Sequence, residues 1–121
     1  MDIADLFGEI KAYQKEMGYD FNKLSPEQRV VILRNYIVAM QVEQVEFLNE
    51  FPWKPWRPVS GQHVGSQEKI ADEWVDCLFF LIDQALCVGL TAEEVVKAYK
   101  NKMKVNIKRI TEGYNQKTKG D

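Results

Sequence analysis

The chain carries two pairs of acidic residues, Glu43-x-x-Glu46 and Glu73-x-x-Asp76, inside two long stretches of helical periodicity. Residues three positions apart lie on one side of an α-helix, so each pair points both carboxylates in nearly the same direction. Apolar residues share these sides. They are Tyr36, Ala39, Met40 and Phe47, together with Glu50, on the side of Glu43, and Ile70, Cys77 and Phe80 on the side of Glu73. We therefore expect the acids to face inward.

Carboxylates in an apolar setting are costly unless they pair with cations or bind a metal. The same helix sides offer few basic partners, so a divalent metal site is the economical explanation. A hard cation such as Mg²⁺ takes oxygen ligands and is commonly held by a few carboxylates together with substrate phosphates. Zinc would favour His or Cys, but the only histidine, His63, lies in a loop, and Cys77 and Cys87 lack ligand spacing. A single Glu-x-x-Glu usually marks a solvated salt-bridge face, whereas two on apolar sides favour metal.

Capping signals and breakers predict an all-α fold of four helices. The first covers about 3–17 and ends near Gly18, and the second begins with the capping box Ser25 to Gln28, with Pro26 at its first position. The others begin after Ser66 and at the Thr91 to Glu94 capping box. The second, third and fourth helices run to about 50, 89 and 113 respectively. We predict one domain over 1–121, with a frayed polar tail after about 114.

A segment of roughly fifteen residues, 51–65, separates the two acidic helices and carries three prolines that forbid regular helix. Connections of this length are usually functional or disordered. Trp53 and Trp56 flank Lys54, and Arg57 follows. An indole here could stack on a flat ligand group while the cations meet an anionic one. The alternative is that both indoles plug the end of the helices or a subunit interface. His63, in the same segment, is read as a mobile loop residue.

The third helix, from about 66 to 89, is apolar almost all round. A helix of this kind needs cover on more than one side, and a chain of 121 residues supplies little. We expect homo-oligomerisation to provide the cover. The alternative is a lone four-helix bundle with this helix at its centre.

Charge and cysteine usage limit which partners and which cellular compartment the protein can have. The net charge of −2 at pH 7 gives no general attraction to nucleic acid or to anionic membranes. The apolar stretch from Cys77 to Leu90 is interrupted by Asp83 and is too short to span a bilayer. Cys77 and Cys87 are about 15 Å apart along one helix, beyond disulfide reach, which predicts free thiols in a reducing compartment. The N-terminus lacks the pattern of a signal peptide, so we expect a cytoplasmic protein with no nucleic-acid or membrane partner.

The order of these motifs resembles the all-α nucleoside triphosphate pyrophosphohydrolase superfamily, which includes the MazG-like proteins and the dimeric dUTPases. The resemblance rests on the two acidic pairs with Trp53-Lys54-Pro55-Trp56-Arg57 between them, and it covers roughly 33–114. In the last helix, Tyr99-Lys100-Asn101-Lys102 followed by Asn106 and Arg109 is similar to a segment that closes over phosphates in the dUTPase branch. This chain is much shorter than the full dimeric dUTPases, so dUTP and another dNTP such as dGTP both stay open as substrates.

The resemblance implies a metal-dependent enzyme that hydrolyses a (deoxy)nucleoside triphosphate to the monophosphate and pyrophosphate in nucleotide-pool control. It implies a MazG-like four-helix bundle completed as a homodimer or homotetramer. Small members occur in bacteriophages, so the compartment would be a bacterial cytoplasm, or the host's if the protein is phage-encoded. The implied catalytic residues, which would also hold two or more Mg²⁺ or Mn²⁺ ions, are Glu43, Glu46, Glu73 and Asp76. The implied substrate-binding residues are Trp53, Lys54, Trp56, Arg57, Lys100, Lys102, Asn106 and Arg109. One of the acids, or Glu50, would be the general base.

Three other readings stay open. The basic stretch that contains Lys100 and Lys102 is also typical of a solvated helix face, which is the favoured interpretation for any single lysine. The whole chain could be a non-catalytic protein-interaction module whose acids form salt bridges across a partner interface, or a nucleotide-sensing module with the same pocket and no turnover. The interaction module predicts that Glu46→Gln lowers metal-free stability because a charge pair is broken. The enzyme predicts unchanged or higher metal-free stability, since carboxylate repulsion is relieved.

Overall fold

The computed structural model describes residues 1–113, and the tail predicted after about 114 lies outside them. Within that range the chain forms α-helices and no strand, which confirms the predicted all-α fold. The elements are α1 (Ile3–Glu16), α2 (Pro26–Leu48), α3 (Gln67–Cys87) and α4 (Ala92–Thr111), with short 3₁₀ turns at Phe21–Lys23 and Val59–Gly61. The chain divides into two compact units, 1–89 and 90–121, which are described separately.

The predicted helix starts are confirmed by their capping geometry. Ser25 and Gln28 close a capping box at α2, and Thr91 and Glu94 close one at α4. The Ser66 side chain accepts a hydrogen bond from the Lys69 N–H at the start of α3. Each interaction satisfies backbone N–H groups that a helix leaves without intrahelical partners. These local signals fix where the helices that carry the acids begin.

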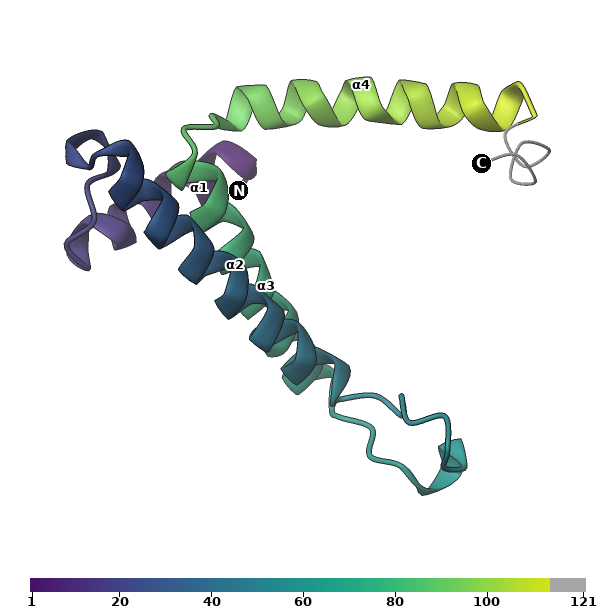
Figure 1. The fold of residues 1–121 in the computed structure, drawn as a ribbon. Helices are drawn as coiled ribbons and strands as arrows, with labels where there is room; N and C mark the ends of the chain where they lie inside the picture. The colour runs from purple at the N-terminus through teal and green to yellow at the C-terminus, as the bar shows by residue number, and fades with distance from the viewer. Residues whose placement is uncertain (114–121) are drawn as a thin grey trace. The chain divides into compact units, whose positions relative to one another are not determined.

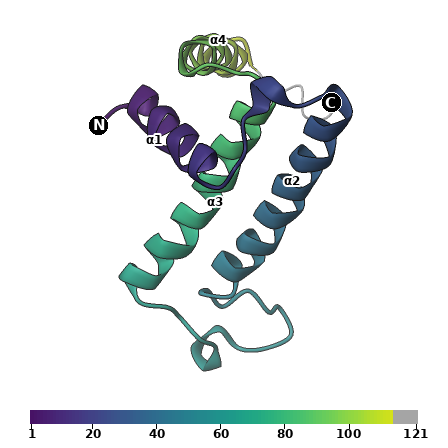
Figure 2. The same ribbon diagram turned by 90° about the vertical axis from the view of Figure 1, so that its left-hand side faces the viewer.

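Helices α2 and α3 lie side by side and run in opposite directions, as both views show (Figures 1 and 2). Contacts along the pair set its register. The Cys87 thiol donates to the Arg29 carbonyl at 3.4 Å, and the ring centroids of Tyr36 and Phe80 lie 6.2 Å apart. This register places the C-terminal half of α2 opposite the N-terminal half of α3, where the acidic pairs lie.

Helix α1 packs against α3 near the end of the pair that is opposite the long loop (Figure 2). Phe7 and Ile10 of α1 are buried with Ile82 and Cys87 of α3. Gly18 follows α1 with a φ of 93°, a left-handed conformation that suits glycine at a helix end. The core of the first unit is therefore small and lies at one end of the helix pair.

Large apolar side chains remain exposed on both long helices of the single chain. Trp74, Phe79 and Leu81 of α3 are 54%, 48% and 52% exposed. The surface that the sequence predicted would need cover is thus still open to solvent within one chain. Helix α2 behaves likewise, with Val31, Val38, Val42 and Val45 exposed.

The segment between α2 and α3 has a defined conformation at the far end of the helix pair (Figure 1). The Gln62 side chain accepts from the Lys54 N–H at 3.1 Å and donates to the carbonyls of Lys54 and Arg57 at 2.9 and 3.1 Å. The Gly65 N–H donates to the Glu50 carbonyl at 2.8 Å, and a Cβ on Gly65 would collide with the Glu50 side chain. Hydrogen bonds from side chains and backbone therefore replace the regular helical hydrogen bonds that the prolines prevent in this segment.

The second unit contains α4, an amphipathic helix. Its exposed apolar residues include Tyr99, Met103, Ile107 and Ile110, and Lys108 forms a 4.0 Å ion pair with Glu112. Among the described helices none alone is long and apolar enough to cross a membrane, although α3 and α4 taken together as a broken pair pass that test of length and composition.

Candidate metal centre and substrate pocket

Three carboxylates from two helices meet in the half of the α2 and α3 pair that is nearer the long loop. Glu43 comes from α2, and Glu73 and Asp76 come from α3. One oxygen from each lies within 4.8 Å of the others. We call these residues the acid cluster. The antiparallel register described above produces this convergence, because it sets the two acidic motifs opposite each other.

The four predicted acids differ in exposure. Glu73 is buried and Glu43 is half-buried, while Asp76 and Glu46 are exposed. Glu46 lies one turn beyond Glu43 on α2 and does not belong to the acid cluster. The structure therefore brings Glu43, Glu73 and Asp76 together and leaves Glu46 beside them.

The acid cluster is electrostatically unfavourable without a cation. Partial burial, followed by the negative charges of Asp76, Glu73 and Glu46, raises the pKa of Glu43. Burial, followed by the negative charges of Glu43, Asp76 and Glu73, also raises the pKa of the Cys77 thiol, which keeps this neighbour neutral. Like charges this close disfavour their own ionised forms, so the site favours a bound cation.

Lys69 is a basic partner that the sequence analysis missed. Its Nζ lies 3.0 Å from Oε1 of Glu73, four residues along α3. The expectation of few basic partners on these helix sides thus needs correction at this position. The spacing of four residues was the available signal, because such pairs face each other on a helix. One ammonium still leaves excess negative charge against three carboxylates.

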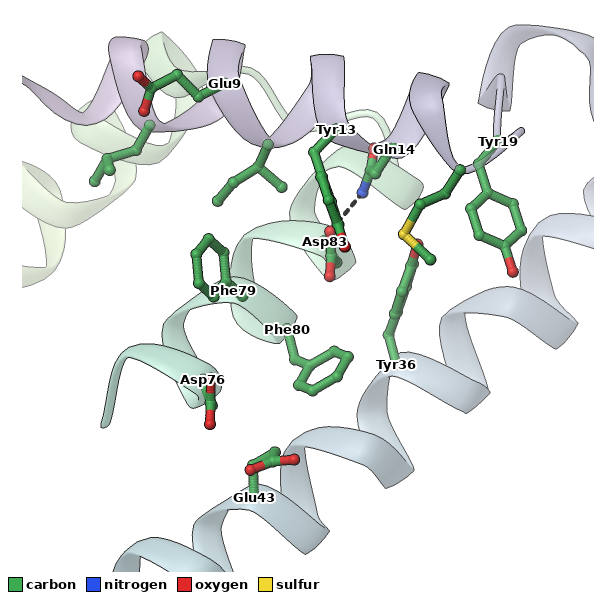
Figure 3. A pocket seen from close by; sticks show the side chains of 13 residues that line it. Glu9, Tyr13, Gln14, Tyr19, Tyr36, Glu43, Asp76, Phe79, Phe80 and Asp83 are labelled. Carbon is green, nitrogen blue, oxygen red and sulfur yellow. Dashed lines mark hydrogen bonds between the residues drawn. The ribbon is translucent and has the colours of Figure 1, made fainter. Parts of the chain in front are cut away.

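An apolar pocket of about 750 Å³ opens between α1, α2 and α3 and includes two members of the acid cluster in its wall. Figure 3 shows Glu43 and Asp76 at one end of it and the aromatic rings of Phe79, Phe80 and Tyr36 along it. The full lining is Leu6, Glu9, Ile10, Tyr13, Gln14, Met17, Tyr19, Tyr36, Glu43, Asp76, Phe79, Phe80 and Asp83. Pockets of this size and polarity suit small organic ligands.

A buried polar pair lies in the pocket wall away from the acid cluster. The Gln14 Nε2 donates to Asp83 Oδ1 at 2.7 Å, and these residues are 3% and 9% exposed (Figure 3). Burial raises the pKa of Asp83, and the hydrogen bond from Gln14 partly opposes this. The Tyr36 hydroxyl also interacts with Gln14, and burial raises its pKa. Sequence patterns missed Gln14, because an isolated glutamine carries no spacing signal.

The predicted Trp and Lys segment forms one structured surface. Trp53 Nε1 donates to Asn49 Oδ1 at 3.1 Å, and the Trp53 and Trp56 rings meet edge to face with centroids 5.8 Å apart. Lys54 is half-buried, and Arg57 is exposed. His63 Nε2 lies 3.1 Å from Oε1 of Glu50, a pairing that the sequence did not indicate.

The predicted phosphate-binding residues Lys100, Lys102, Asn106 and Arg109 all lie on α4, in the second unit. Each has an exposed side chain. Their role in binding phosphate stays a prediction.

The donor set of the acid cluster fits a hard divalent cation. It offers three carboxylate oxygens, one from a buried residue, in a space that ligands of one ion can share. Neither cysteine nor histidine contributes a ligand atom to it. Mg²⁺ or Mn²⁺ matches this chemistry better than zinc.

Comparison with known proteins identifies the family of the chain. A family model described as dUTPase matches residues 6–88, a stretch that contains α1, α2, α3 and both acidic motifs. No curated protein and no solved structure matches the chain. Because the matched stretch exceeds half of the 121 residues, the chain belongs to this all-α dUTPase family, a family of hydrolases that act on nucleoside triphosphates.

Proposed function

We propose that the protein is a metal-dependent pyrophosphohydrolase that converts a (deoxy)nucleoside triphosphate and water to the monophosphate and pyrophosphate. The observation that carries this proposal is the acid cluster at the end of an apolar pocket, in a chain of the dUTPase family. Control of a nucleotide pool is the cellular role that this reaction would serve. The free cysteines suit a reducing cytoplasm, bacterial or that of a phage-infected host.

Glu43, Glu73 and Asp76 would hold the divalent cation, and the exposed Glu46 would join in binding a second ion. When bound, such ions neutralise phosphate charge and make a water more acidic, so that hydroxide is available near neutral pH. The protein's own part is to fix the carboxylates on two paired helices. Rigid helices hold ligands more precisely than loops do.

The pocket supplies a place for the nucleoside. Its aromatic wall offers surfaces for a base, and the seven-residue step from Asp76 to Asp83 spans about 10 Å of helix. A triphosphate at the acid cluster could thus extend its sugar and base toward Gln14 and Asp83. The family description makes dUTP the first substrate to test, with dGTP and the other dNTPs beside it.

Cationic side chains and one amide would meet the outer phosphates. Lys54 and Arg57 belong to the structured loop, and the α4 residues Lys100, Lys102, Asn106 and Arg109 complete the proposed set. Trp53 and Trp56 would stack on base or ribose. Charge-assisted hydrogen bonds to phosphate oxygens are the strong ones, which favours these residue types.

We also propose that the protein works as a homodimer or homotetramer. Val31, Val38, Val42 and Val45 are exposed and repeat along α2 at steps of seven, four and three residues, a seam that a second helix can cover. A lysine at Val38 would place a charge in this seam, so Val38→Lys should lower the molar mass to that of a monomer. Light scattering after size-exclusion chromatography measures this, with Gln44→Lys on another side of α2 as the control. A monomeric wild-type protein would contradict the proposal.

The reaction is tested by incubating the protein with each common dNTP and NTP, with and without Mg²⁺ or Mn²⁺, and separating products by ion exchange. We expect monophosphate and pyrophosphate only with metal, and the ranking of bases gives the substrate class. Wild-type turnover in both Glu46→Gln and Asp76→Asn would overturn the site. Metal-dependent binding without product would identify a nucleotide sensor instead.

A further inference from the structure

Lys69 faces the acid cluster from one turn earlier on α3. Its Nζ is 3.0 Å from Oε1 of Glu73, whose side chain is 9% exposed, while the Lys69 side chain is 56% exposed. The hydrogen bond to Glu73 raises the pKa of Lys69, so the ammonium stays charged at neutral pH. A buried carboxylate is thereby paired with a cation that solvent can reach.

The ammonium contacts a carboxylate that a metal ion would also bind. Glu73 is the buried member of the acid cluster, and one of its oxygens lies within 4.8 Å of one oxygen each of Glu43 and Asp76. Two cations at one carboxylate repel each other, and this repulsion is strong at a partly buried site. Lys69 and a divalent cation therefore cannot both hold Glu73 at the distances seen here without cost.

Lys69 also has other carboxylates nearby with which its ammonium can interact. Its side chain is long and flexible, and its ammonium is strongly hydrated, so it leaves a single partner easily. Glu50, at the end of α2, already acts on it electrostatically and raises its pKa further, as does Asp72. Glu50 is in turn held at 3.1 Å by His63 of the loop.

We propose that Lys69 is a positioning residue that serves as the counter-ion of Glu73 in the metal-free protein and is displaced when a divalent cation binds the acid cluster. Lys69 thus stabilises the cluster while it is empty and competes with the metal for it. This inference rests on the metal site of the proposed function.

The test measures Mn²⁺ binding to the full chain without nucleotide, by electron paramagnetic resonance of free Mn²⁺, and the melting temperature in chelator. Lys69→Met removes the charge and keeps the length of the side chain. We expect it to bind Mn²⁺ about two- to fivefold more tightly, the range that loss of one partly exposed charge pair gives. Its metal-free melting temperature should fall, because Glu73 loses its counter-ion.

Two further variants sharpen the result. Lys69→Arg keeps the charge and should restore both wild-type values. Lys108→Met breaks a second lysine and glutamate pair of this spacing, between Lys108 and Glu112 at the end of α4, and should change neither value. Competition with metal, rather than helix stability in general, would then account for the Lys69→Met phenotype.

The outcomes separate this inference from the proposed function. Equal or weaker Mn²⁺ binding by Lys69→Met would overturn the competition while leaving the metal site in place. An unchanged metal-free melting temperature would overturn the counter-ion role whatever the protein catalyses. If neither wild type nor Lys69→Met binds Mn²⁺ at millimolar concentration, both the competition and the metal site are wrong.

Discussion

Two acidic sites on α3 are treated in opposite ways by the fold. Asp83 is buried beside α1 and accepts one short hydrogen bond from the neutral amide of Gln14. Glu73, three turns earlier, meets two further carboxylates and one lysine. The protein's own groups thus satisfy the pair of Asp83 and Gln14, which we call the neutral site because the partner is a neutral amide. They leave the acid cluster, which we call the charged site, with excess negative charge. This contrast separates an acid whose partner is a neutral amide of the protein from acids that keep excess negative charge.

The causes of the pKa shifts follow the same division. Burial alone raises the pKa of Asp83, whereas burial together with three neighbouring acids raises that of Glu43. A bound cation can relieve repulsion between acids but cannot relieve the burial of a lone carboxyl. Each difference between the sites can therefore be tested by changing one residue.

The largest effect is expected at the charged site. Glu73→Gln keeps the shape of the side chain and removes its charge, so metal affinity and pyrophosphate release should fall at least about a hundredfold. Release of pyrophosphate in the presence of Mg²⁺ measures this. The matched control is Glu68→Gln in the first turn of the same helix, where the side chain is exposed and activity should be unchanged. Activity of Glu73→Gln within a few-fold of wild type would mean that the two sites do not differ as described.

A change at the neutral site should alter the free energy of unfolding and leave metal affinity as it is. Gln14→Ala leaves Asp83 buried without its hydrogen-bond donor, which should cost about 1–3 kcal/mol in the free energy of unfolding. Urea denaturation in chelator measures it, with Gln44→Ala, at an exposed position of α2, as the control. Mn²⁺ affinity should stay at the wild-type value. A stability equal to wild type would show that water replaces the amide, and that Asp83 is less isolated than its burial indicates.

Local sequence signals predicted the fold and most of the charged site. Capping boxes fixed the starts of α2 and α4, and the three-residue spacing placed Glu73 and Asp76 on one side of α3. Such signals act within one helix, where geometry follows directly from spacing. The convergence of Glu43 with the α3 acids depends on helix register, which the order of the motifs only implied.

Contacts between distant segments could not be predicted in the same way. The partners Gln14 and Asp83 are 69 residues apart, and nothing in either local pattern favours the other. The bonds from Gln62 that hold the proline-containing loop join residues up to eight positions apart without any repeating pattern. Glu46 shows the converse, since it holds the same motif position as Asp76 but lies outside the acid cluster. Spacing identifies a helix side, and packing decides what that side contacts.

The pH dependence of stability should reveal the raised pKa of Asp83 at the neutral site, and no metal is needed for the measurement. The folded pKa of Asp83 is raised, so the folded protein binds a proton more tightly there than the unfolded chain does. Its contribution to stability is present below the unfolded pKa of about 3.9 and is lost as pH rises through the folded value. Asp83→Asn lacks this contribution, so wild-type stability relative to the variant should fall as the pH rises above about 4.

Urea denaturation of both proteins at intervals of pH measures this difference. The shift at Glu43 is present in both and cancels from the comparison. A constant difference across the range would mean that Asp83 keeps an ordinary pKa in the folded protein, and the contrast between the two sites would then rest on geometry alone.

The smallest effect is expected from Tyr36, whose hydroxyl interacts with Gln14 of the neutral site. Tyr36→Phe removes a hydroxyl that interacts with Gln14, and the expected cost is about 0.5–1.5 kcal/mol. Tyr13→Phe at a 64% exposed residue of the same pocket is the control. Combining Tyr36→Phe with Gln14→Ala gives the coupling, because residues of one network lose less together than the sum of their separate losses. Additive losses would show that Tyr36 and Gln14 act separately, and Asp83 would then depend on the amide alone.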